Sequence, residues 1–179
     1  MTTQSIVESG MTFGPYRNCE FFHIEKSKRY AAIRKNVKMA EFLLLRGSRE
    51  EPVMYVVEAK SSAPRPGSQD FDKFIGKTRE KLINAFALGW ASCIMRHQEA
   101  EEELPERLRA LCLWNVDVKF VLVINGHEID WLLPLNDALK KALYPIVKCW
   151  AKSPNSVIVL NDAMAREYKL IRPAPGGGN

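Results

Sequence analysis

A run of apolar residues from Val53 to Val57 leads directly into Glu58-Ala59-Lys60, and this junction constrains the chain more than any other segment. Short apolar runs rich in β-branched residues are typical of buried strands. Successive side chains of a strand point to opposite faces, so Glu58 and Lys60 share one face while Ala59 lies on the other. The sequence therefore predicts a carboxylate and an ammonium side by side where a buried strand ends.

A second apolar run, 39–45, contains Glu41, and the polar stretch 46–52 between the two runs is typical of a turn. We expect the runs to pair as an antiparallel hairpin whose paired positions sum to about 98, which places Glu41 opposite Val57. A slip of one residue would place Glu41 directly opposite Glu58, with Cβ atoms roughly 5 Å apart. In that register the two carboxylates could share one divalent cation.

Two acidic side chains and a lysine at adjacent strand ends suit metal-assisted hydrolysis of phosphodiesters. The arrangement resembles the PD-(D/E)xK nuclease superfamily, in which a strand with an acidic residue precedes a strand ending in (D/E)-x-K and then a long helix. The matching segments here are Glu41, Glu58-Ala59-Lys60 and residues 70–96. The chain departs from the family pattern because Glu41 replaces the more usual aspartate and no proline precedes it.

The resemblance covers residues 20–125 and implies a restriction-endonuclease-like core. It implies that Glu41 and Glu58 hold Mg²⁺ or Mn²⁺ and that Lys60 positions the attacking water. Many family members place a further glutamate ligand on an N-terminal helix. Glu20 and Glu25 are both candidates, and the predicted ligand set includes Glu25.

The activity that the resemblance implies is that of a Mg²⁺-dependent endonuclease, with DNA as the expected substrate. The alternative is a catalytically silent subunit or adaptor with the same fold, working in a nucleic-acid-processing, repair or antiphage defence complex. A third hypothesis is a nucleic-acid-binding protein without chemistry. Many nucleases of this type dimerise to cut both strands, so a homodimer is one expected assembly.

Hydrophobic periodicity predicts helices over 71–96 and 131–150, a short last helix over 164–170, and strands over 116–125 and 156–160. Asp70 can cap the first of these helices. Strands that alternate with long helices predict an α/β fold, a mixed central β-sheet flanked by helices.

Basic residues are expected to contact a nucleic-acid backbone on two segments. One is a predicted helix over 26–38, and the other is the face of the 71–96 helix on which lysines recur every four residues. The simpler explanation for both is a solvated helix face, as for the acidic stretch within 98–108. The predicted contacts are Lys28, Arg29, Lys73, Lys77 and Lys81.

With 179 residues, the chain is expected to form one nuclease-like domain over 1–172, followed by a flexible tail at 173–179. Its net charge of +5 suits a polyanionic partner such as a nucleic acid. Its four cysteines contain no CxxC pair, and each of its three histidines is expected to be a hydrogen-bonded structural residue. The sequence has no signal segment and no apolar run of about 18 residues, so a cytoplasmic protein without a membrane partner is expected.

Overall fold

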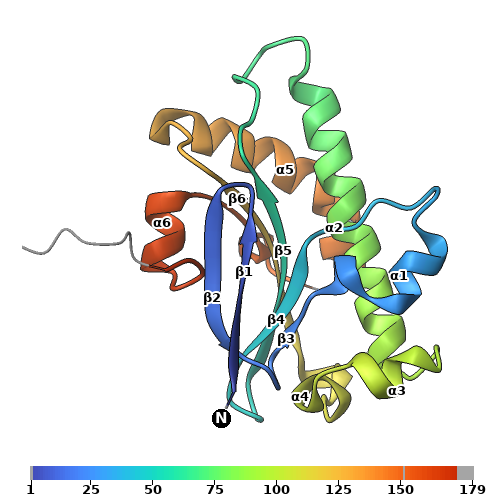
Figure 1. Ribbon diagram of the computed structural model, residues 1–179. Helices are drawn as coiled ribbons and strands as arrows, with labels where there is room; N and C mark the ends of the chain where they lie inside the picture. The colour runs from blue at the N-terminus through green and yellow to red at the C-terminus, as the bar shows by residue number, and fades with distance from the viewer. Residues whose placement is uncertain (1, 151, 173–179) are drawn as a thin grey trace, which may run out of the picture.

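The computed structural model describes residues 2–150 and 152–172, so the predicted tail at 173–179 lies outside the described residues. At its centre is a five-stranded sheet in the order β3-β4-β5-β6-β7 (Figure 1). Neighbours pair antiparallel from β3 to β5 and parallel from β5 to β7. The predicted mixed central sheet flanked by helices is therefore confirmed. Its strands are β3 (Phe21–Phe22), β4 (Phe42–Gly47), β5 (Pro52–Lys60), β6 (Asp117–Ile124) and β7 (Val157–Asn161).

Two long helices, α2 (Phe71–Cys93) and α5 (Ile129–Cys149), cover one face of the sheet. Helix α2 buries Leu82 and Phe86 against it, and burial of one such side chain stabilises the fold by about 1.5–3 kcal/mol. A Cβ on Gly89 would lie only 2.5 Å from a methyl group of Leu43, so a glycine here permits the close approach of α2 to β4.

The bounds of these helices differ by up to three residues from the predicted ranges of 71–96 and 131–150. Asp70 precedes α2 but forms no capping hydrogen bond with its side chain, because its backbone is already helical. Helix α5 begins at Ile129, so Pro134 is its sixth residue and lies beyond the first turn, and the helix runs through both Pro134 and Pro145 without ending.

A hairpin of β1 (Thr3–Glu8) and β2 (Met11–Arg17), which the sequence did not lead us to expect, covers the opposite face together with α6 (Asp162–Glu167). Phe13 is fully buried there, and the hydroxyl of Tyr16 donates to the carbonyl of Leu170 at 2.5 Å. The hairpin brings Glu8 to the same edge of the sheet as the segment that follows β3.

The segment predicted as a helix over 26–38 is only partly helical. The chain forms a single 3₁₀ turn and then a helix of only six residues. The acidic stretch within 98–108 forms two short helices. These elements are η1 (Ile24–Lys26), α1 (Lys28–Ile33), α3 (Glu99–Glu103) and α4 (Glu106–Arg109), and the remaining 3₁₀ turns are η2 (Leu113–Asn115) and η3 (Pro154–Ser156).

Candidate functional site

The hairpin register brings the two predicted acidic ligands together. Phe42 pairs with Val57, so the paired positions sum to 99 and continuation by one residue sets Glu41 opposite Glu58. The expected sum of about 98 was therefore wrong by one residue. Gly47 pairs with Pro52, so the loop contains four residues. The centre of the hairpin therefore lies between residues 49 and 50 and not at residue 49. The amide of Glu41 donates to the carbonyl of Val57 at 3.0 Å and fixes this end of β4.

Glu58 is fully buried and is contacted by two lysines. Lys60 Nζ lies 2.5 Å from its Oε1, and Lys81 Nζ, from α2, lies 2.9 Å from the same atom. Lys81 also lies 3.8 Å from Oε1 of Glu41. Lys81 was predicted to contact a nucleic-acid backbone, but it points into the carboxylate cluster because its helix packs directly over this end of β5.

Burial and crowding of negative charge dominate the electrostatics of the cluster. The pKa of Glu41 is raised to about 9 by burial, by a side-chain hydrogen bond with Glu25 and by the charge of Glu58. Burial also raises the pKa of Glu58, against the opposing effect of Lys81 and Lys60. The pKa of Lys81 is raised, because the combined effect of the nearby carboxylates exceeds the opposing effect of burial. Near neutral pH, Glu41 therefore holds a proton and Lys81 is charged.

Of the two glutamates considered as a further ligand, the structure brings Glu25 to the cluster. Its side chain meets that of Glu41, and its backbone amide donates to the carbonyl of Glu41 at 3.3 Å. It lies on the 3₁₀ turn η1 rather than on the expected helix. Glu20 is instead paired with Arg17 and Arg107.

The donor set suits a hard divalent cation. Glu25, Glu41 and Glu58 offer carboxylate oxygens, which Mg²⁺ and Mn²⁺ prefer. Within the described residues, Oε2 of Glu41 and Oε2 of Glu58 are buried and meet no hydrogen-bond donor. Buried oxygens without a donor are costly unless something compensates them, so these atoms fit a cation.

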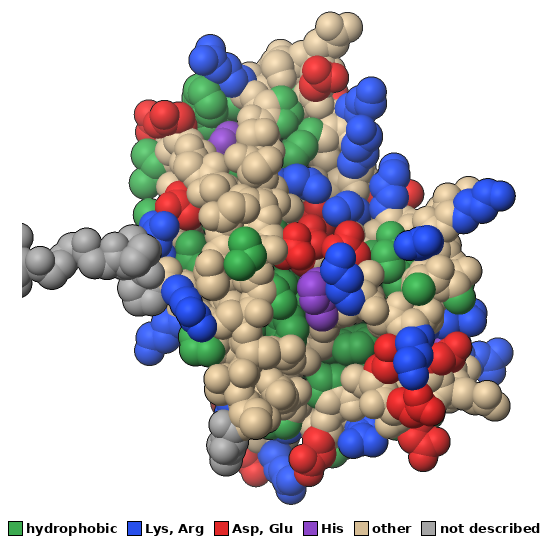
Figure 2. Space-filling model, viewed as in Figure 1, with side chains coloured by type: hydrophobic (Ala, Val, Ile, Leu, Met, Phe, Trp, Pro, Cys, Tyr) green, Lys and Arg blue, Asp and Glu red, His purple; other side chains and the backbone are tan. Residues whose placement is uncertain are grey.

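His23 and Glu8 lie next to this cluster, and sequence analysis did not single them out. His23 Nε2 lies 3.8 Å from Oε1 of Glu8, and one ligand atom from each of Glu8, His23 and Glu25 lies within 4.8 Å of the others. The expected structural hydrogen bond of His23 is absent at Nε2, which has no partner among the described residues. Burial and Lys26 lower the pKa of His23, against the effect of Glu25. Figure 2 shows acidic side chains gathered beside a histidine near the centre of one face, with basic side chains around them.

The other predicted nucleic-acid contacts differ in how available they are. Lys73 and Lys77 are exposed and border an open concavity of about 340 Å³ between α2 and the loop before it. Lys28 is exposed but its ammonium lies 2.7 Å from Glu102, so the acidic helix α3 offsets its charge. Arg29 is half-buried, and its Nε has no partner among the described residues.

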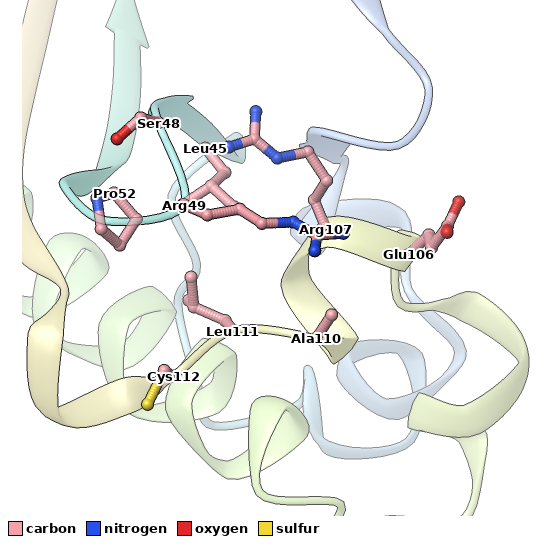
Figure 3. A pocket seen from close by; sticks show the side chains of 9 residues that line it. All are labelled: Leu45, Ser48, Arg49, Pro52, Glu106, Arg107, Ala110, Leu111 and Cys112. Atoms are coloured by element: carbon pink, nitrogen blue, oxygen red, sulfur yellow. The ribbon is translucent and has the colours of Figure 1, made fainter.

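A pocket of about 290 Å³ lies away from the carboxylates, at the opposite end of β5 (Figure 3). Pro52 lines it, and Glu58 lies about 20 Å further along the strand at roughly 3.3 Å per residue. Arg107 also lines it but is bound to Glu20 and to the carbonyl of Gly47. The pocket therefore forms no part of the carboxylate cluster.

Comparison with protein-family models, with curated proteins and with solved structures found no match for this chain. None of the helices in the described part of the chain combines the length and apolar character needed to cross a bilayer.

Proposed function

We propose that this chain is a Mg²⁺- or Mn²⁺-dependent nuclease of the PD-(D/E)xK type that cleaves phosphodiester bonds, with DNA as its substrate. The observation that carries the proposal is the convergence of Glu41 and Glu58 at the end of the β4–β5 hairpin, with Lys60 in contact with Glu58. These residue types support the resemblance found in the sequence, because strand-end carboxylates and a lysine are what such chemistry requires.

Glu41 and Glu58 would hold the cation, with Glu25 as a third oxygen ligand. A bound cation of this kind polarises a phosphate and lowers the pKa of a bound water. Glu41 must release its proton to serve as a ligand, since it is protonated near neutral pH. Binding is therefore expected to strengthen as the pH rises from neutral toward the Glu41 pKa of about 9.

Lys60 and Lys81 have different roles in this proposal. Lys60 is the more exposed, with 29% of its side chain accessible against 19% for Lys81, so it can reach a water or phosphate oxygen at the mouth of the site. Lys81 lies between Glu58 and Glu41 and balances the charge of Glu58 from within the fold. Only Lys60 is assigned to the reacting groups.

The test is cleavage of supercoiled plasmid, single-stranded DNA and RNA by the purified chain with Mg²⁺, Mn²⁺ or EDTA. Glu58→Gln and Lys60→Met should abolish cutting of the preferred substrate, and EDTA should do the same. Glu51→Gln, at an exposed turn glutamate, is the control and should cut as the wild type does. Cutting that persists in EDTA or in Glu58→Gln would overturn the proposed mechanism.

One contact favours the alternative of a catalytically silent subunit. Lys81 already offsets the charge of Glu58 and also lies beside Glu41, and such an internal ammonium can replace a cation instead of assisting it. Helix α5 also exposes Ile129 and Leu133, each with 67% of its surface accessible, as a surface for another protein. Calorimetry that finds no Mg²⁺ or Mn²⁺ binding to the folded wild type would favour this alternative over the nuclease.

A further inference from the structure

Glu8, His23 and Glu25 form a compact group at the edge of the carboxylate cluster. One ligand atom of each lies within 4.8 Å of the other two, and His23 Nε2 is 3.8 Å from Glu8. Two donors bound at roughly 2.1 Å to one cation lie about 3 to 4.2 Å apart, so small side-chain adjustments bring all three into range. The residues come from β1, from the segment after β3 and from η1.

A second feature points to a ligand at this place. Glu41 is only 5% exposed, its carboxyl is turned onto Glu25, and its Oε2 meets no donor among the described residues. The imidazole Nε2 of His23 is also buried and has no hydrogen-bond partner in the part of the chain that the structure describes. Buried acceptors that lack a donor are rare unless an ion or water serves them.

We propose that Glu8, His23 and Glu25 form a second cation site that selects a transition metal such as Mn²⁺, Co²⁺ or Zn²⁺ over Mg²⁺. An imidazole nitrogen is a good ligand for transition metals, whereas Mg²⁺ prefers oxygen ligands and retains its water. The site differs from the oxygen-only set of Glu41 and Glu58, which has no nitrogen ligand. Glu25 touches both sets and links the two sites.

Solvent can deliver the ion. The side chains of His23 and Glu8 are 22% and 26% exposed, so the group opens to the surface while Glu58 lies deeper. Occupancy does not depend on nuclease chemistry, because none of the three residues needs a phosphodiester to bind a metal. The inference therefore goes beyond the proposed function and can hold even where that function fails.

The experiment is a Co²⁺ titration of the untagged full chain, followed by its visible absorption and by calorimetry, with Mg²⁺ titrated in parallel. The Co²⁺ bound at this group should show a d–d spectrum of nitrogen and oxygen ligands, without the intense ultraviolet band of a cobalt–thiolate bond. His23→Ala and Glu8→Gln should each weaken Co²⁺ binding by at least about tenfold. Circular dichroism and thermal melting show that each variant is folded.

Two controls keep the outcomes distinct. His97→Ala removes a histidine from outside the group and should leave Co²⁺ binding unchanged. Glu58→Gln should retain Co²⁺ binding at His23 even though it is expected to abolish cutting. Failure of cutting with Co²⁺ binding intact would reject the nuclease alone. Co²⁺ binding that is absent, shows thiolate ligation, or is unchanged in folded His23→Ala would overturn the second site.

Discussion

Lys81 Nζ lies 2.9 Å from Oε1 of Glu58 and joins the long helix α2 to the strand that carries the Glu-x-Lys motif. The same ammonium lies 3.8 Å from Glu41, so one helix residue faces a carboxylate from each of two neighbouring strands. Lys81 therefore couples the docking of α2 to the charge state of the site. A ligand that changes this charge also changes how firmly the helix is held.

We predict that Lys81→Met lowers the free energy of unfolding by about 1–3 kcal/mol at pH 7, because it removes one of the two ammonium groups beside the fully buried Glu58. Urea unfolding followed by circular dichroism measures the change. Lys77→Met, one turn earlier on the exposed face of α2, should stay within about 0.5 kcal/mol of the wild type. Equal stabilities for the two variants would contradict the coupling.

The raised pKa of Glu41 predicts how stability depends on pH. A carboxyl whose pKa is higher in the folded chain holds its proton more tightly there, so unfolding releases that proton between pH 4.5 and about 9. Stability contributed by this group falls as the pH rises through that window. Glu41→Gln removes the titration, so urea midpoints at pH 5, 7 and 9 should fall more steeply for the wild type.

At its steepest this difference is about 1.4 kcal/mol per pH unit for one proton. Glu58, whose pKa is also raised, adds a slope of the same sign in both proteins. The pKa of Lys81 is raised from 10.5, so its contribution is constant below pH 9. Parallel pH profiles for the wild type and Glu41→Gln would show that Glu41 is ionised in the folded chain.

Substitution of Glu20 and of Glu25 should have different effects on stability and on metal binding. Glu20→Gln weakens the pairing with Arg17 and Arg107, so it should lower the urea midpoint and leave Mn²⁺ affinity unchanged. Glu25→Gln should instead weaken Mn²⁺ binding by at least about tenfold, since Glu25 meets Glu41. Calorimetric titration with Mn²⁺ measures the metal affinity of each variant, and urea unfolding measures its midpoint. The reverse pattern would assign the ligand role to Glu20.

The central hairpin and its neighbours could be predicted because their sequence pattern is local. Each strand of the pair β4–β5 is an apolar run, the loop between them is polar, and α2 follows with apolar residues at helical spacing. These signals were sufficient to place Glu41 near Glu58. The exact register was not predictable, because it depends on how many residues the loop contains.

The missing parts of the prediction depend on contacts between distant segments. Strand β2 contains Gly14 and Pro15 and has no long apolar run, and its burial comes from contacts such as Tyr16 with Leu170. The positions of Glu8 and His23 beside Glu25 follow from that hairpin and could not be read from spacing. Lys81 looked like a member of an exposed lysine row, since only the packing of α2 turns it inward.

Lys73 and Lys77 give the last prediction, which concerns the substrate path. Both are exposed beside the loop that follows Lys60, so a nucleic-acid backbone entering the site should contact them. For duplex DNA, each phosphate contact adds about 0.9 to the steepness with which log affinity falls as log salt rises. The double variant Lys73→Ala, Lys77→Ala loses two such contacts, so this steepness should decrease by about 1.8. Fluorescence anisotropy with a labelled duplex in Ca²⁺ measures this slope. Lys28→Ala is the matched control and should leave it unchanged, because Glu102 already offsets that ammonium. If Lys28→Ala changed the slope more than the Lys73→Ala, Lys77→Ala double variant does, the substrate path would lie along α1 instead.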